Sequence, residues 1–121
     1  MARLLVVDDD PHFLDSLVLL LQDSGHLVVT ATNGAAALKA LATSMPDAIV
    51  TDLCMPEKDG LELILEVRRR FPRLPIIATS GQFDPGFNLL RMAKVLGAAS
   101  VISKPFRRTD ICRAVDAALL T

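Results

Sequence analysis

The sequence predicts an α/β protein in which helices cover both faces of a parallel sheet. Short apolar runs alternate with longer amphipathic segments along all 121 residues, which is the pattern of repeated strand–helix units. The run at residues 4–7 is apolar at every position and therefore predicts a strand that is buried on both faces. No long linker interrupts the alternation, so we expect residues 1–121 to form one domain.

Three strands and two helices are expected in the first half of the chain. The first strand, residues 3–7, is followed by Asp10 and Pro11, which supply a side-chain cap and a proline at the first helical position. Apolar residues then keep helical spacing until Gly25, which ends the helix. The elements expected next are a strand at residues 27–31, an Ala-rich helix at residues 34–43 and a strand at residues 48–51 that ends at Asp52.

The second half of the chain predicts three more helices and two more strands. Residues 83–96 hold a loop and a helix that Gly97 closes, and the turn sequence at residues 84–86 predicts that this helix starts late, after a mobile loop. The other elements are expected at residues 61–71, 75–79, 101–103 and 109–120. In the last helix, the residues expected to face inward are Ile111, Val115, Ala118 and Leu119.

Composition narrows the class of function. Thirteen basic and fourteen acidic residues leave a formal net charge of −1, which gives no electrostatic reason for direct binding to nucleic acid or to an anionic membrane. We find neither a signal-peptide pattern nor an apolar run long enough to span a bilayer. Cys54 and Cys112 form no metal-finger spacing and no CxxC pair, so we expect reduced thiols in a cytoplasmic protein.

Polar side chains follow four of the five expected strands. Asp8 and Asp9 come after the first strand, Asp52 after the third, Ser80 after the fourth and Lys104 after the fifth. The carboxyl ends of parallel strands meet at one edge, where ligands of such sheets bind. Clustered carboxylates without soft ligands suit a hard divalent cation, and Mg²⁺ is the commonest. Lys104 fits as the partner of an anionic group beside that metal.

Each of these residues also has a simpler interpretation when it is taken alone. Asp10 is best explained as the cap of the first helix. Asp52 is also compatible with a loop residue before a turn, Ser80 is uninformative by itself, and a single lysine such as Lys104 is more often a solvated surface charge. Capping does not explain both Asp8 and Asp9, because one helix needs one cap. The prediction of a site therefore rests on the joint placement.

Four stretches of the sequence resemble a known family. VVDDDP, VTDLCMPEKDG, PIIATSG and ISKPF occur in this order and at suitable spacing across essentially the whole chain. Together they make the chain similar to a receiver domain of a two-component response regulator. The resemblance implies a doubly wound, flavodoxin-like sheet of five strands in the order 2-1-3-4-5, with five helices.

The resemblance also implies roles for the residues at the sheet edge. Asp52 is implied as the phosphoryl acceptor, Ser80 as the switch hydroxyl and Lys104 as the contact to a phosphoryl oxygen. A cis peptide bond is implied at Pro105. The implied Mg²⁺ ligands are Asp8, Asp9, Asp52 and the backbone carbonyl of Cys54.

The implied function is phosphoryl acceptance, not catalysis beyond slow autodephosphorylation. The donor is expected to be a phosphohistidine on a sensor histidine kinase or a histidine phosphotransfer protein, because the chain has no nucleotide-binding glycine motif of its own. The output partner or effector domain is not identifiable from the sequence, and a homodimer through helix four, strand five and helix five is one option.

The sequence departs from the family pattern at three places. Val101 stands where the family often has an aromatic switch residue, so we expect the loop at residues 83–87 to shift instead. Cys54 and Gln82 occupy positions that tend to tune the phosphoryl lifetime in the family. The segment between Ser80 and Gly97 is about two residues longer than the resemblance leads us to expect.

Two rival functions remain open at this point. A phosphohydrolase of the haloacid-dehalogenase type also begins with Asp-x-Asp after its first strand, which Asp8 and Asp10 satisfy, and Lys104 fits its downstream lysine. That family needs a further acidic pair on a later strand, whereas only a helix is expected after Lys104. The second rival is a receiver-shaped interaction module that is never phosphorylated, and the intact set of site residues argues against it.

Overall fold

The computed structural model describes residues 2–53, 60–81, 89–104 and 106–120. Strands and helices alternate throughout, as the sequence predicts. The strands are β1 (Arg3–Val7), β2 (Leu27–Ala31), β3 (Ala48–Asp52), β4 (Ile76–Ser80) and β5 (Ser100–Ser103). The helices are α1 (Pro11–Asp23), α2 (Gly34–Thr43), α3 (Gly60–Arg70), α4 (Leu89–Leu96) and α5 (Arg108–Leu119).

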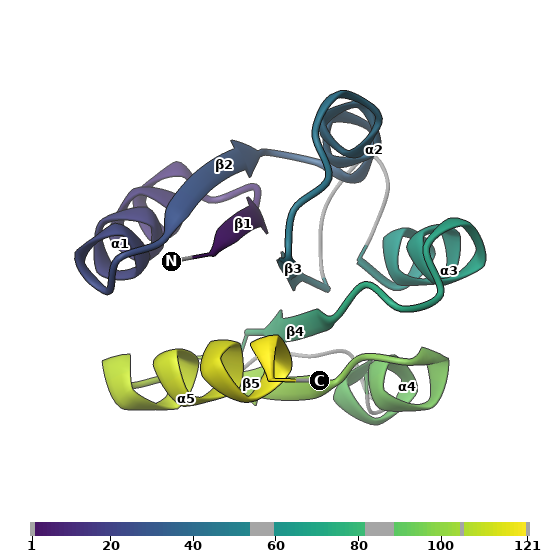
Figure 1. Ribbon diagram of the computed structural model, residues 1–121. Coiled ribbons are helices and arrows are strands. Elements are labelled where there is room, and N and C mark those ends of the chain that lie inside the picture. Colours follow the sequence, from purple (N-terminus) through teal and green to yellow (C-terminus); the bar gives the residue numbers. More distant parts are fainter. Residues whose placement is uncertain (1, 54–59, 82–88, 105, 121) are drawn as a thin grey trace.

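All five strands are parallel and form one sheet in the order β2-β1-β3-β4-β5. The doubly wound topology 2-1-3-4-5 is therefore confirmed. The order reverses direction between β1 and β3, which lie side by side at the centre of the sheet (Figure 1). Ligands of such sheets bind at this switch point, outside the carboxyl ends of the strands.

Helices pack on both faces of the sheet and bury two separate apolar clusters. Alternate residues of one strand point to opposite faces, so Leu4 and Val6 of β1 pack with α1 and α5, whereas Leu5 and Val7 pack with α2, α3 and α4. Figure 1 shows α1 and α5 on one side of the strands and α2, α3 and α4 on the other. The expected burial of β1 on both faces is thus confirmed.

The predicted ends of several elements differ from the structure by one or two residues. β4 runs over Ile76–Ser80 instead of 75–79, and β3 includes Asp52, because pairing with the neighbouring strand continues to Asp52↔Thr79 and Ser80↔Ser103. The fourth helix is described from Leu89 onward. The loop expected at residues 83–87 lies outside the described residues.

Local signals explain where several helices begin and end. The Asp10 carboxylate accepts hydrogen bonds from the backbone N–H groups of His12 (3.0 Å) and Phe13 (3.4 Å), so Asp10 is the cap of α1. Gly25 and Gly97 follow α1 and α4 with φ of 93° and 116°, a left-handed conformation that favours glycine. In the described parts of the chain, no helix is both long and apolar enough to cross a bilayer.

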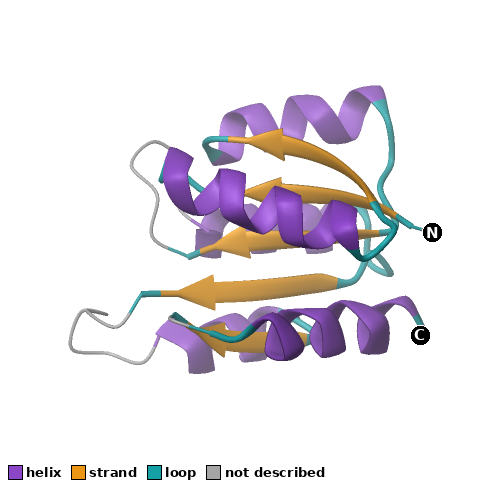
Figure 2. Ribbon diagram, turned by 90° about the vertical axis from the view of Figure 1, so that its left-hand side faces the viewer, coloured by secondary structure: helices purple, strands orange, loops and turns teal. Residues whose placement is uncertain are grey.

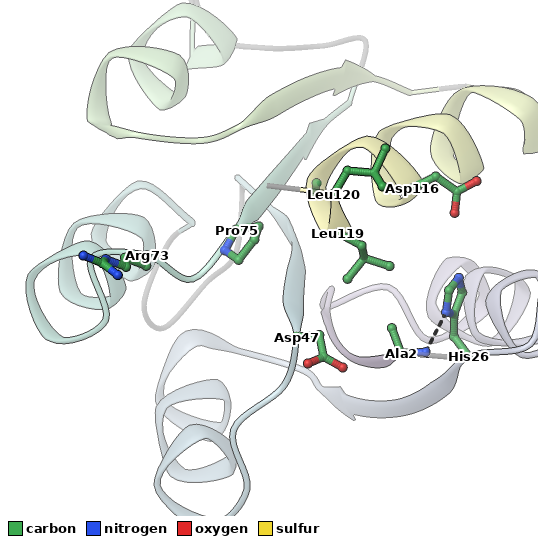
Figure 3. A pocket seen from close by; sticks show the side chains of 9 residues that line it. Ala2, His26, Asp47, Arg73, Pro75, Asp116, Leu119 and Leu120 are labelled. Carbon is green, nitrogen blue, oxygen red and sulfur yellow. Dashed lines mark hydrogen bonds between the residues drawn. The ribbon is translucent and has the colours of Figure 1, made fainter.

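A surface pocket of about 680 Å³ lies at the amino edge of the sheet. Its side chains come from residues that precede strands and from the end of α5, including His26, Asp47, Pro75 and Leu119 (Figure 3). Asp47 is already engaged here, because its carboxylate accepts a hydrogen bond from the backbone N–H of Arg3 at 2.8 Å. This pocket lies at the opposite edge of the sheet from the predicted site residues.

Candidate functional site

The parallel sheet brings the predicted site residues to one edge. Figure 2 shows all five strands ending on the same side. Asp8 directly follows β1, Asp52 ends β3, Ser80 ends β4 and Lys104 directly follows β5. Four strand ends therefore deliver acidic, hydroxyl and basic groups to the region outside the switch point.

Three carboxylates form the centre of this site. One oxygen from each of Asp8, Asp9 and Asp52 lies within 4.8 Å of the others. Asp8 is 1% exposed and Asp52 is 5% exposed, whereas Asp9 is open to solvent. Burial of like charges at this distance is unfavourable, so the cluster favours a cation.

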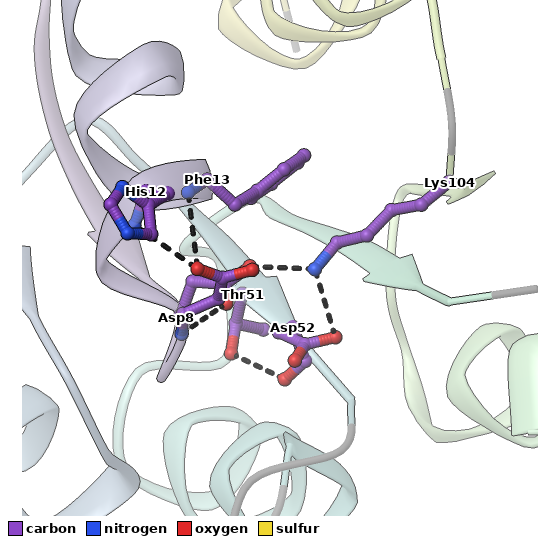
Figure 4. A network of polar contacts seen from close by, with 7 residues as sticks. Asp8, His12, Phe13, Thr51, Asp52 and Lys104 are labelled. Carbon is purple, nitrogen blue, oxygen red and sulfur yellow. Dashed lines mark hydrogen bonds and ion pairs between the residues drawn. The ribbon is translucent and has the colours of Figure 1, made fainter.

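Lys104 supplies one cation to the cluster. Its Nζ donates a hydrogen bond to Oδ2 of Asp8 at 2.7 Å and forms an ion pair with Oδ1 of Asp52 at 3.6 Å (Figure 4). The Lys104 side chain is only 19% exposed, so solvent screens these contacts less than it screens a surface ion pair. Lys104 is therefore not the solvated surface charge that a single lysine usually is.

Backbone hydrogen bonds hold these side chains in place. The second oxygen of Asp8, Oδ1, accepts from the backbone N–H of Asp10 at 3.0 Å. The backbone N–H of Lys104 donates to the carbonyl of Ser80 at 2.6 Å, which ties the end of β5 to the end of β4. The Thr51 hydroxyl donates to the carbonyl of Asp52 at 3.0 Å. The site residues thus extend directly from the ends of the strands.

Ser80 lies at the same edge and is fully buried. It pairs with Ser103 in the β4–β5 register, one residue before Lys104, so the predicted switch hydroxyl and the predicted lysine belong to neighbouring strand ends. Cys54 and Pro105 fall outside the described residues, and the carbonyl ligand and the cis peptide bond predicted for them stay predictions.

Asp10 is separate from the carboxylate cluster. Its oxygen is engaged by the first turn of α1, and the group of carboxylates that could hold a metal consists of Asp8, Asp9 and Asp52. The Asp8–Asp10 pair that a haloacid-dehalogenase-type site requires is therefore not assembled here.

Phe13 belongs to this site although the sequence did not indicate it. The Nζ of Lys104 lies 4.0 Å from the centre of the Phe13 ring. Phe106 meets the same ring edge-on, with ring centres 5.6 Å apart and planes at 88°. Helical spacing marked Phe13 only as an apolar residue of α1, and no local pattern links it to a lysine that follows β5.

The donor set fits a hard divalent cation. Among the described residues of this cluster, three carboxylates lie beside one ammonium group, so acidic groups outnumber basic ones. The three carboxylates offer oxygen ligands, and no thiol or imidazole belongs to the described cluster. This is the chemistry that Mg²⁺ prefers, with water and phosphate oxygens as its remaining ligands.

Comparison with known proteins agrees with the topology. Residues 4–116 match the family described as response regulator receiver domain. The transcriptional regulatory protein GlrR of Escherichia coli K12 is 36% identical over 118 residues, which are 98% of this chain and 26% of that protein. The Bacillus subtilis regulator PhoP, named for alkaline phosphatase synthesis, is 36% identical over 97% of this chain and 48% of its own length.

Solved structures show the same relationship. The receiver domain of NtrX from Brucella abortus superposes with a TM-score of 0.92 at 31% identity and covers 98% of both chains. A putative response regulator from Chloroflexus aurantiacus gives 0.92 at 30% identity, over 99% of this chain and 98% of that one. The chain spans about a quarter to a half of the curated relatives named above. It belongs to the family of receiver domains of two-component response regulators.

Proposed function

We propose that Asp52 is the phosphoryl acceptor of this receiver domain. The observation that carries the proposal is the joint placement of a buried Asp52 carboxylate, two further carboxylates and the Lys104 ammonium outside the switch point of the sheet. The donor is a phosphohistidine on a sensor histidine kinase or on a histidine phosphotransfer protein. Residues 1–121 act as one receiver unit in this proposal.

The transfer itself needs few groups from the protein. An oxygen of Asp52 forms a bond to phosphorus while the phosphorus–nitrogen bond of phosphohistidine breaks, and the imidazole nitrogen keeps the electron pair. Because negative charge spreads over the transferred oxygens, positioned cations stabilise the transition state. Lys104 would take this role, and the distance of 3.6 Å between its Nζ and Oδ1 of Asp52 supports it.

Asp8, Asp9 and Asp52 would hold the Mg²⁺ ion, together with the backbone carbonyl of Cys54. The ion supplies further compensation of the charge on the phosphoryl oxygens. The backbone N–H of Asp10 donates a hydrogen bond to the Asp8 carboxylate and holds it in position. Asp9 is exposed to solvent. The product is an acyl phosphate, and the chain acts as a stoichiometric acceptor with at most slow autodephosphorylation.

Phosphorylation replaces one carboxylate charge by a phosphoryl group with a charge of about −1.5 to −2. The Ser80 hydroxyl would move to the phosphoryl group, and Lys104 would contact one of its oxygens. Ser80 ends β4 and Lys104 directly follows β5. The adjoining face of α4, β5 and α5 is therefore the proposed output surface, for an effector or for a second copy of the chain. Val101 packs half-buried against the cluster under α2, α3 and α4 and has no ring that could rotate.

The proposed exchange takes place in the cytoplasm, because histidine kinases draw their phosphoryl group from ATP. The relatives named above are transcriptional regulatory proteins, and we place any contact with DNA outside these 121 residues. The receiver itself then acts through protein contacts, without direct binding to nucleic acid or membrane.

Intact-mass spectrometry after incubation with acetyl phosphate and Mg²⁺ tests the acceptor. The wild type should gain one phosphoryl group, and Asp52→Asn should gain none, because an amide oxygen is a far weaker nucleophile than a carboxylate. Asp15→Asn, an exposed position on α1, is the matched control and should be labelled like the wild type. Undiminished labelling of Asp52→Asn would show that another residue carries the phosphoryl group.

A further inference from the structure

Among the described residues, three groups surround the ammonium of Lys104. Two are carboxylates, Asp8 at 2.7 Å and Asp52 at 3.6 Å, and the third is the face of the Phe13 ring, with its centre at 4.0 Å (Figure 4). A cation over an aromatic face is attracted by the ring quadrupole, and the attraction grows as the cation is removed from water. Lys104 is 19% exposed, so the ring contact is largely sheltered.

The Phe13 ring does not depend on Lys104 for its position. Its backbone N–H lies in the first turn of α1, capped by Asp10. The Phe106 ring supports it edge-on, and both rings pack against the apolar cluster under α1 and α5. The ring is therefore a fixed surface against which the flexible lysine side chain is held.

The two carboxylates, by contrast, are the groups that the proposed function uses. Asp8 is a proposed Mg²⁺ ligand, and its oxygen Oδ2 is the atom that Lys104 now contacts. Asp52 is the proposed acceptor and loses its carboxylate charge when it becomes an acyl phosphate. Of the three partners of Lys104, Phe13 is the one that neither Mg²⁺ binding nor phosphorylation changes. This distinction rests on the proposed function.

We propose that Phe13 is a positioning residue that keeps the Lys104 ammonium at the site when metal and phosphoryl group engage its carboxylate partners. The ring face attracts the cation without occupying a lone pair, so N–H groups of Lys104 stay available for a phosphoryl oxygen. Phe13 acts through Lys104 and does not touch the reacting atoms itself.

The kinetic test compares phosphorylation rates at saturating Mg²⁺ with acetyl phosphate as the donor. Phe13→Leu keeps an apolar side chain but removes the ring, and it should slow labelling of Asp52 about threefold to thirtyfold, the range that one cation–π contact spans. Phe13→Tyr keeps the ring and should retain the wild-type rate. Phe71→Leu, a half-buried phenylalanine on the other face of the sheet, is the matched control and should also retain it.

A double substitution separates positioning from packing. If Phe13 acts through Lys104, Phe13→Leu should have no further effect on the rate in a Lys104→Met background. An equal slowing in both backgrounds, or equal rates of Phe13→Leu and Phe71→Leu, would overturn the proposal. Thermal unfolding of each variant shows whether it is folded.

The spectroscopic test does not depend on phosphorylation. In the wild type, the ring current of Phe13 should shift the ε-methylene protons of Lys104 upfield, and Phe13→Leu should abolish the shift. The shift should persist when Mg²⁺ is added, and again when beryllium fluoride is added as a phosphoryl mimic. Loss of the shift when Mg²⁺ is added to the wild type would overturn the positioning role of Phe13. If the shift persists but Asp52 is not labelled by acetyl phosphate, only the assignment of Asp52 as the acceptor is refuted.

Discussion

At the carboxyl edge of the sheet, two of the three clustered carboxylates, Asp8 and Asp52, contact the ammonium of Lys104, whereas at the amino edge charged side chains are paired with backbone groups. Arg68 of α3 donates to the carbonyls of Pro72 at 2.7 Å and Gly97 at 2.9 Å. The carboxylate of Asp47 accepts from the N–H of Arg3. Among the described residues, one edge gathers carboxylates around a lysine, and at the other edge charged side chains hydrogen-bond to the backbone.

The difference shows how one fold separates stability from function. Arg68 joins the ends of α3 and α4, where helix carbonyls lack partners within the helix, and partial burial lowers the pKa of its guanidinium without removing its charge. In the proposed function, the carboxylates of the other edge bind a divalent cation and accept a phosphoryl group. Substitutions at the two edges should therefore respond differently to Mg²⁺.

The largest effect on stability is expected from Lys104→Met in the absence of Mg²⁺. The substitution keeps most of the apolar stem but leaves the buried carboxylates of Asp8 and Asp52 without their cation, which should cost about 3 kcal/mol of unfolding free energy. Mg²⁺ should stabilise this variant more than the wild type. Urea denaturation with and without Mg²⁺ measures both quantities, and an unchanged midpoint without metal would contradict the role given to Lys104.

A smaller effect is expected from Arg68→Ala at the amino edge. It removes two short charge-assisted hydrogen bonds to backbone carbonyls, and we expect a loss of about 2 kcal/mol. The added stability from Mg²⁺ should equal that of the wild type. Arg69→Ala is the matched control, because this side chain is 73% exposed in its pair with Glu66 and should cost about 0.5 kcal/mol or less. Equal destabilisation by Arg68→Ala and Arg69→Ala would show that the hydrogen bonds of Arg68 to the backbone do not stabilise the fold.

The sequence predicts the fold because its signals are local. Apolar runs fix the strands, and Asp10, Gly25 and Gly97 mark helix ends by their own side chains or backbone conformations. The strand ends then follow from topology, which is why Asp8 and Asp52 could be placed at one edge before any contact was known. Strand boundaries were less accurate, because the last residue of a strand is set by pairing with its neighbour.

The contacts that the sequence could not predict join side chains far apart in the chain. Arg68 is explained locally by the negative end of its own helix, yet in the structure it also reaches Gly97. In the same way, nothing in the first turn of α1 indicates that Phe13 faces Lys104. Long side chains reach across elements, and their partners depend on packing that no local pattern records.

The stability gained from Mg²⁺ tests the central claim, that the carboxyl edge of the sheet is completed by a cation. Thermal unfolding of the wild type, Asp9→Ala and Asp47→Ala would be measured with Mg²⁺ from zero to about ten times its dissociation constant. Binding to the folded state alone should then stabilise the wild type by about 1.4 kcal/mol. Asp9→Ala should lose most of this gain, because Asp9 is one of the three clustered carboxylates. Asp47→Ala, at the amino edge, should keep all of the gain even though it loses the hydrogen bond to Arg3. Equal gains in the wild type and in Asp9→Ala would contradict the account.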